Sequence, residues 1–275
     1  MRSMPPYTPK VRTITPGRPL AWLGMAWNDM RRAGWLSFAH GLALTLAGAV
    51  IVGLAYNRFW FLAGALSGFM VIAPVLATSL YALSRALERK EEANWGVVLK
   101  TWLNWQGSHL NKWDNDYWCM VQFGSLLALA ATGWVMTSAA LITLLAPVPI
   151  QTPMDFVHHV ILAPDGGLFE LWLALGGLMA APVFASSVVA MPMLLDRRVT
   201  LWQAVLTSWQ TVLTNPIPMA LWAALIMGFT LLGLGSMLLG LITIIPMLGH
   251  ASWHAYRELV DVSGIPAREP LNDRS

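Results

Sequence analysis

Runs of about twenty apolar residues alternate along this chain with shorter segments that hold most of its charged side chains. Since a helix needs about 20 apolar residues to cross a hydrocarbon core of about 30 Å, each run predicts a transmembrane helix. We expect six, at about residues 35–55, 60–82, 120–145, 168–195, 218–236 and 237–256. The last two form one stretch broken only by Gly233, Gly235 and Ser236, where we predict a tight outer turn.

Each pair of predicted spans follows a segment with an amphipathic helical pattern, at about residues 20–31, 95–105 and 200–213. The second and third share the pattern Trp-x-x-Val-Leu-x-x-Trp, which places Trp95 with Trp102, and Trp202 with Trp209, on one helical face. The first resembles a degenerate copy that contains Trp27. Such Trp-rich faces are typical of helices in the membrane interface.

The expected fold class is therefore an all-α membrane protein whose six transmembrane helices form three parallel helical-hairpin repeats, each preceded by a cytoplasmic amphipathic interfacial helix. The second span of each hairpin contains the pattern Pro-x-Leu, at Pro74, Pro192 and Pro246. A proline inside a helix removes one backbone hydrogen bond and favours a kink. Kinks at matching positions would line a central cavity, and the alternative is that they only shape helix packing.

Charge indicates the orientation of the chain in the membrane. Only 11% of the residues are charged and 56% are hydrophobic, whereas a soluble domain has about 25% charged residues. With six spans, sixteen of the seventeen Lys and Arg residues lie on one side, and Arg58 lies on the other. Because basic loops stay in the cytoplasm, we expect both termini there, as mobile tails at residues 1–19 and 261–275, around one membrane domain at 20–260.

Three histidines are the candidate functional residues within the apolar part of the chain. His250 and His254 share a helical face, and His40 has a comparable depth in the first span. If the first and last spans adjoin, the three form a polar cluster that opens to the cytoplasm. An ionisable residue inside a membrane indicates a functional site, and the alternative is a hydrogen-bonded structural histidine.

We predict no cofactor, although a haem or a metal at the histidine cluster stays open as an alternative. The zinc-protease pattern requires Glu at the position of Ala251, so a metal would need ligands from another helix. Cys119 is the single cysteine and has no partner for a disulfide. Asp196 should pair locally with the arginines that follow it. The outer loop should contain a short helix capped by Thr152.

No phosphate-binding glycine loop and no nucleophile elbow occurs in the sequence, which argues against an enzyme. No basic stripe with interleaved aromatic residues occurs either, so we expect the lipid bilayer and no nucleic acid as a partner. The oligomeric state stays open.

Four strings of the C-terminal half carry a resemblance to a known family: MPMLLDRR, WQAVLTSW, NPIPMALWAALI and IIPMLGHASWHAYREL. With them the chain resembles a bacterial family of predicted integral membrane proteins of unknown function, over about residues Arg18 to Val260. Some members are described as similar to cytochrome c oxidase subunit I. The resemblance implies the bacterial cytoplasmic (inner) membrane and a role beside a respiratory complex, and it implies no catalytic residues.

Three functions follow as hypotheses. The first is a non-catalytic accessory or assembly factor of a larger membrane complex. The second is a small transporter or channel with a central cavity lined by kinked helices. The third is a metal or haem redox protein that uses the histidine cluster.

Overall fold

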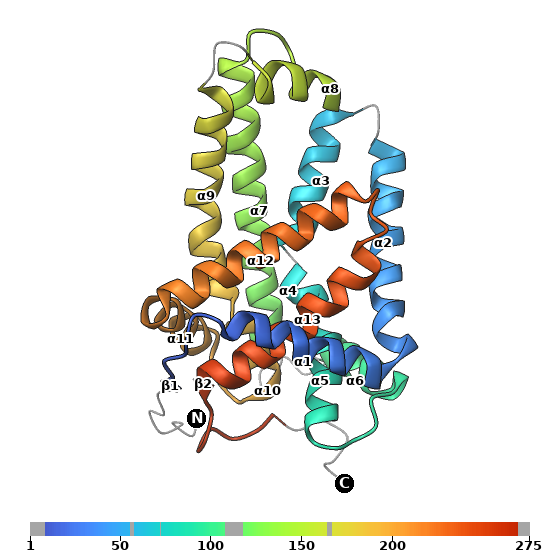
Figure 1. Cartoon of the computed structure of the whole chain (residues 1–275), viewed down its shortest axis with the longest axis vertical. Coiled ribbons are helices and arrows are strands. Elements are labelled where there is room, and N and C mark those ends of the chain that lie inside the picture. Colours follow the sequence, from blue (N-terminus) through green and yellow to red (C-terminus); the bar gives the residue numbers. More distant parts are fainter. Residues whose placement is uncertain (1–8, 56–57, 72, 108–117, 164–166, 269–275) are drawn as a thin grey trace. The chain divides into compact units, whose positions relative to one another are not determined.

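The structure, a computed structural model, describes residues 9–55, 58–71, 73–107, 118–163 and 167–268, and these residues are mostly helical (Figure 1). In chain order the elements are β1 (Lys10–Val11), α1 (Arg18–Ala33), α2 (Trp35–Ala55), α3 (Phe59–Val71), α4 (Ala73–Leu76), α5 (Thr78–Glu88), α6 (Trp95–Gly107), α7 (Trp118–Leu145), α8 (Pro153–Phe156), the π-helical turn η1 (Val157–Ile161), α9 (Leu168–Ser187), α10 (Ala190–Asp196), α11 (Leu201–Thr214), α12 (Pro216–Gly235), α13 (Leu241–Leu259) and β2 (Val260–Asp261).

Four helical segments in the described part are long and apolar enough to cross a membrane: α2, α7, α9 continued into α10, and α12. The all-α character is thereby confirmed, while the six spans and their repeats stay a prediction. The predicted second span at 60–82 is interrupted among the described residues by a turn at Ala77, after which α5 begins at Thr78. The predicted sixth span coincides with most of α13, which is less apolar than α12.

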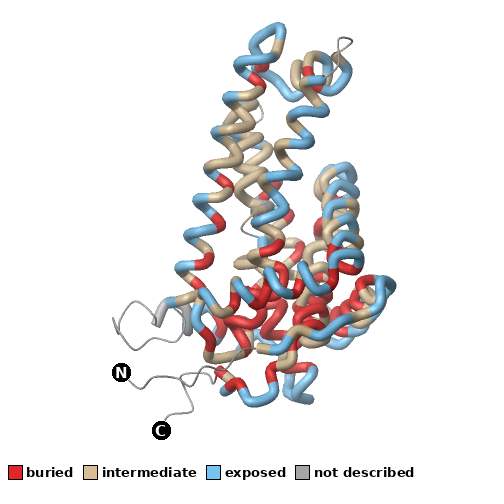
Figure 2. Tube along the Cα trace, turned by 90° about the vertical axis from the view of Figure 1, so that its left-hand side faces the viewer, coloured by how far each residue is buried: buried red, intermediate tan, exposed pale blue. Residues whose placement is uncertain are grey.

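The chain divides into two compact units, of which the first contains residues 1–45, 74–123 and 185–275. In this unit α13 packs along α1 and also contacts α5 and α12. Buried residues gather among these helices (Figure 2). The rings of Trp22 and Trp222 meet edge to face, with centroids 5.5 Å apart, and join α1 to α12. The strands β1 and β2 pair antiparallel beside them.

A turn of five residues joins α12 to α13. The Ser236 hydroxyl donates a hydrogen bond to the carbonyl of Gly233 and accepts one from the backbone N–H of Gly240, each 2.8 Å long. The positive φ angles fall on Met237 and Leu238, at 52° and 71°, and not on the neighbouring glycines. The glycines instead allow close packing, because a Cβ at Gly233 would meet the side chain of Leu241.

A glycine also sets the close approach of α2 to α13. Pro246 has no N–H, so it cannot bond the carbonyl of Ile242 one turn earlier in α13. That carbonyl faces Gly41, where a Cβ atom would lie 2.6 Å from the carbonyl carbon of Ile242, and closer still to its oxygen. The carbonyl that Pro246 cannot bond therefore lies against Gly41 of the other helix.

The three predicted kink positions differ in the structure. Pro74 lies in the short α4 and Pro192 in α10, which begins after a break that follows Ser187. Pro246 lies inside α13, which continues through it without interruption. The helix breaks thus occur near two of the three prolines, and a cavity between all three stays a prediction.

The second unit contains residues 46–73 and 124–184. Its aromatic side chains gather around Trp172 of α9, whose indole N–H donates to the Ser138 hydroxyl at 2.7 Å. The rings of Phe156 and Trp134 lie 5.5 and 5.6 Å from that of Trp172. The predicted cap of the outer loop is confirmed, because Thr152 and Asp155 form a reciprocal capping box at the start of α8.

Candidate functional site

His250 lies at the centre of the first unit and is fully buried. It projects from α13 between α2 and α5, and both of its ring nitrogens have partners. Nε2 lies 2.9 Å from the hydroxyl of Ser37, and Nδ1 lies 2.7 Å from the hydroxyl of Ser84. A single imidazole thus links three helices.

The chain of hydrogen bonds continues to Asp29 of α1, which is buried among the same helices. The Ser84 hydroxyl donates to Oδ2 of Asp29 at 2.7 Å, and Nε2 of His254 lies 2.9 Å from the same oxygen. The five residues of this chain, Ser37, His250, Ser84, Asp29 and His254, are named here the histidine network. Its one partly exposed end is His254, whose side chain is 20% accessible.

The bonds of the histidine network determine which nitrogen of His250 carries the proton. A serine hydroxyl has one proton to donate, and that of Ser84 goes to Asp29. Nδ1 of His250 must therefore be the donor to Ser84, which leaves Nε2 to accept from Ser37. The hydrogen bonds from Ser37 through His250 and Ser84 all run in one direction, toward the carboxylate of Asp29.

Electrostatics keep that carboxylate ionised. Burial raises the pKa of Asp29, but hydrogen bonds from His254 and Ser84, together with the nearby imidazoles, outweigh burial and lower the pKa overall. Asp29 therefore offers a negative charge to any proton that reaches the imidazoles.

His40 has other neighbours. Its Nδ1 lies 2.8 Å from the carbonyl of Leu36 in the preceding turn of α2. Its ring stacks on that of Trp95 from α6, with the centroids 6.3 Å apart and the planes 18° apart. Of the three predicted histidines, the structure joins His250 and His254 through Ser84 and Asp29, and it places His40 against Trp95 of α6.

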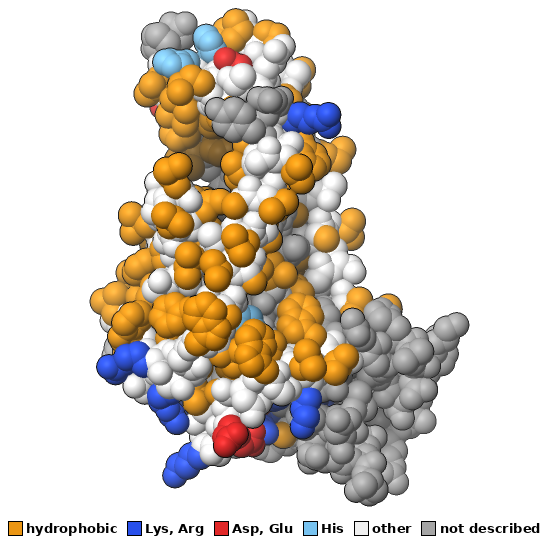
Figure 3. Space-filling model, turned by 90° about the vertical axis from the view of Figure 1, so that its right-hand side faces the viewer, with side chains coloured by type: hydrophobic (Ala, Val, Ile, Leu, Met, Phe, Trp, Pro, Cys, Tyr) orange, Lys and Arg blue, Asp and Glu red, His pale blue; other side chains and the backbone are white. Residues whose placement is uncertain are grey.

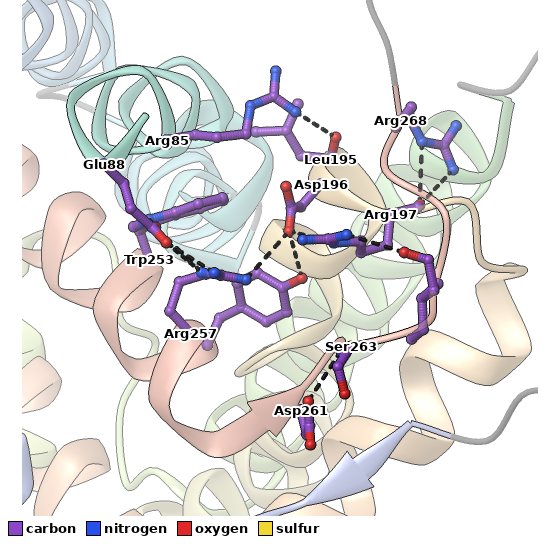
Figure 4. Close-up of polar contacts among 12 residues, drawn as sticks. Arg85, Glu88, Leu195, Asp196, Arg197, Trp253, Arg257, Asp261, Ser263 and Arg268 are labelled. Atoms are coloured by element: carbon purple, nitrogen blue, oxygen red, sulfur yellow. Dashed lines mark hydrogen bonds and ion pairs between the residues drawn. The ribbon is translucent and has the colours of Figure 1, made fainter. Parts of the chain in front are cut away.

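A second polar cluster surrounds Asp196 at the end of α10 (Figure 4). Its carboxylate is buried and accepts a hydrogen bond of 2.9 Å from the hydroxyl of Tyr256. The guanidinium of Arg197 lies 2.9 Å away, and those of Arg89 and Arg257 lie 3.7 and 3.8 Å away. Asp196 pairs with Arg197 as the sequence indicated, but it also collects partners from α13 and from the end of α5.

Glu88 extends this cluster toward the surface. It accepts a hydrogen bond from the indole N–H of Trp253 at 2.9 Å and forms an ion pair of 2.8 Å with Arg257. Farther along α13, Glu258 pairs with Arg18 and accepts from the indole N–H of Trp22. The C-terminal part of α13 is thus fixed by ion pairs and hydrogen bonds to α1, α5 and α10.

The sequence patterns did not point to Asp29, Glu88 and Tyr256 as members of these clusters. Asp29 could have been picked out from the sequence, because it is an acidic residue on the predicted first interfacial helix. The structure shows that its side chain is buried. No sequence feature pointed to Ser37 or Ser84, since serines are common in membrane helices and only the tertiary fold aligns these two with an imidazole.

The described residues include no group of three or more His, Cys, Asp or Glu side chains that could hold a metal ion. Cys119 lies beside Arg268, whose Nη2 is 3.6 Å from the sulfur.

The segments predicted as interfacial helices form α1, α6 and α11. On α6 the exposed side chains include Trp95, Leu99 and Trp102, and on α11 they include Trp202, Leu206 and Trp209. The two helices therefore expose corresponding positions of the shared pattern.

Residues 61–196 match a family described as predicted integral membrane protein (DUF2189). No curated protein and no solved structure matches the chain. The chain is an integral membrane protein, and its resemblance to a family of predicted integral membrane proteins is confirmed over that range. Of the four strings that carried the resemblance, only MPMLLDRR overlaps the matched residues.

Proposed function

We propose that this integral membrane protein is a non-catalytic accessory or assembly component of a larger, respiratory-type complex in the bacterial cytoplasmic membrane, with both termini in the cytoplasm. The observation that carries the proposal is the pair of exposed tryptophan faces on α6 and α11. The six spans and three repeats belong to the same proposal, in which these helices lie at headgroup depth.

The two faces have the composition of a protein-binding surface. Trp95 is 57% exposed and Trp202 is 69% exposed, and each is followed by a leucine and a second tryptophan along the same face. Tryptophan is enriched at the energetic centres of protein interfaces, and charged residues are depleted there. On the face of the molecule seen in Figure 3, large hydrophobic side chains lie above several Lys and Arg side chains.

Charge favours a protein over lipid alone as the occupant of the α11 face. Helices that bind a membrane surface by themselves are rich in Lys and Arg on their polar side. The α11 helix has the sequence LWQAVLTSWQTVLT and contains no charged residue, and α6 contains only Lys100. We therefore assign the two faces to contacts with helices of a neighbouring membrane protein.

The polar clusters supply a rigid support for these faces. The histidine network and the cluster around Asp196 join α1, α2, α5, α10 and α13 through buried hydrogen bonds and ion pairs. Preorganised surfaces bind with a smaller entropic cost than mobile ones. In this interpretation the buried histidines hold the base of the protein in one conformation.

Extraction in native lipid with a polymer, followed by affinity purification and mass spectrometry, tests the proposal. The tagged wild-type protein should bring down a defined set of membrane proteins, and the double variant Trp95→Ala/Trp202→Ala should lose most of it. Trp35→Ala is the matched control, since Trp35 is 68% exposed but lies outside both faces. Recovery of the wild-type protein alone would reject the accessory role.

A small transporter is the second candidate, favoured by the one-directional hydrogen bonds of the histidine network. Buried ionisable side chains in line often carry protons in transporters. Under this function the purified protein in liposomes would conduct protons, and Ser84→Ala would reduce the flux because it interrupts the line between His250 and Asp29. No flux above that of empty liposomes would remove this candidate.

A further inference from the structure

A polar pocket of about 320 Å³ lies beside the β1–β2 pair in the first unit. Its walls include Arg12, Arg197 and Arg257, together with Asp261 and the following turn through Ser263 and Gly264. Figure 4 shows Arg197, Arg257, Asp261 and Ser263 around this region. The pocket is separate from the histidine network and from the tryptophan faces.

Two of the arginines are held in place by groups behind them. Arg197 bonds Asp196 through Nε at 2.9 Å and the carbonyl of Ile265 through Nη1 at 3.0 Å. Arg257 is held by Glu88, at 2.8 Å. Neither Asp196 nor Glu88 lines the pocket. The two guanidinium groups are therefore positioned before any ligand arrives.

The third arginine, Arg12, is more exposed, and it pairs with Asp261, the one acidic side chain of the pocket lining. The side chain of Arg12 is 53% exposed, and its Nη2 lies 3.4 Å from Oδ1 of Asp261. Hydrogen bonds from Ser263 lower the pKa of Asp261, so this carboxylate is ionised at neutral pH. The lining thus carries three positive charges and one negative charge.

We propose that this pocket binds a phosphate group of a dianionic ligand, either a soluble phosphate or the monoester headgroup of a lipid. Arginine is suited to this chemistry because a guanidinium has five N–H donors, and Arg197 and Arg257 use only some of theirs on the groups that hold them. The volume lies at the lower end of the range of about 300–1,000 Å³ typical of ligand pockets, which fits a phosphate with a small substituent. The ligand displaces Asp261 from Arg12.

This arrangement predicts opposite effects for two neighbouring substitutions. Arg12→Gln removes a positive charge and should weaken phosphate binding about tenfold, as expected for one charge-assisted hydrogen bond. Asp261→Asn removes the internal competitor and should strengthen binding several-fold. Arg18→Gln is the matched control, because Arg18 also pairs with an acidic side chain, Glu258, but does not line the pocket.

The experiment is titration calorimetry of the full chain in nanodiscs of phosphatidylcholine, with inorganic phosphate as the probe at low ionic strength. Binding that changes in opposite directions in the Arg12→Gln and Asp261→Asn variants supports the site. Absence of binding, or binding that both variants leave unchanged, overturns it. Equal weakening by Arg12→Gln and Arg18→Gln also overturns it, since that result indicates only a general surface charge.

Nanodiscs that contain phosphatidic acid distinguish the two sources of phosphate. If a lipid headgroup occupies the pocket, the affinity of the wild-type protein for inorganic phosphate falls at least tenfold in these discs. If the ligand is soluble, the affinity is the same in both discs. Each result supports the phosphate site and identifies its ligand class.

Discussion

The contact between Gly41 and Ile242 gives the most direct test of how the first unit is assembled. In the Gly41→Ala variant the new methyl group would lie 2.6 Å from the carbonyl carbon of Ile242 and 2.9 Å from its Cα. Carbon atoms rest about 3.5–4.0 Å apart, so α2 and α13 would have to separate by roughly 1 Å. The obstacle is backbone, which cannot rotate away as a side chain can.

Three terms determine the stability of this variant, one favourable and two unfavourable. Alanine is more favourable than glycine in a helix by about 1 kcal/mol. Overpacking of a close contact costs about 1–3 kcal/mol and more where backbone must move. The separation would also lengthen the bond between Ser37 of α2 and His250 of α13, which costs about 1 kcal/mol for a buried hydrogen bond. We expect a net loss of about 2 kcal/mol.

Equilibrium unfolding in mixed detergent micelles, followed by tryptophan fluorescence, measures this loss. Gly24→Ala is the matched control, because the new methyl group on α1 would meet no neighbouring side chain or helix within 4 Å, and it should be neutral or slightly stabilising. Gly249→Ala should fall between the two, since its nearest neighbour is the flexible side chain of Leu80. A Gly41→Ala variant as stable as Gly24→Ala would refute the close crossing of α2 and α13.

Two further predictions concern the carboxylates of the first unit. The pKa of Asp29 is lower in the folded protein than its unfolded value near 3.9, so its contribution to stability is full above that value and is lost as the pH falls through the folded value. Thermal unfolding between pH 7 and pH 3 should therefore show a flatter acid decline for Asp29→Asn than for the wild type, and equal slopes would contradict the assignment. Asp196→Ala should lower the free energy of unfolding by about 3 kcal/mol, because it leaves the buried hydroxyl of Tyr256 without its acceptor and Arg197 without its carboxylate. The exposed Glu92→Ala should stay within about 0.5 kcal/mol of the wild type in the same chemical unfolding experiment, and a similar value for Asp196→Ala would refute the role of that cluster.

Local signals in the sequence predicted local structure well. The apolar run at Trp35–Ala55 became α2 with the same bounds, since both its length and its lack of charge indicate one helix. The cap at Thr152 was predictable because a capping box depends on residues only three positions apart. The turn after Gly235 lies where the small residues interrupt the apolar stretch.

Contacts between distant segments could not be predicted in the same way. The sequence placed His250 and His254 on one helical face, but it could not show that Asp29, more than two hundred residues earlier, accepts from His254. Nor does any spacing rule align Ser84 with both His250 and Asp29, because that depends on how α1, α5 and α13 cross. The sequence identified residues able to form a polar cluster, and the fold selected their partners.

The difference in apolar character between α12 and α13 reflects whether each helix faces lipid or other helices. Both helices are about twenty residues long, yet only α12 is apolar enough to count as a span on its own. Leu231 and Leu232 of α12 are exposed, as expected of side chains that face lipid. In α13 the polar residue His250 is fully buried and hydrogen-bonded to other helices. A helix enclosed by protein can carry polar side chains that a lipid-facing helix cannot, and the lower hydropathy of α13 is consistent with its packing against α1, α2 and α5.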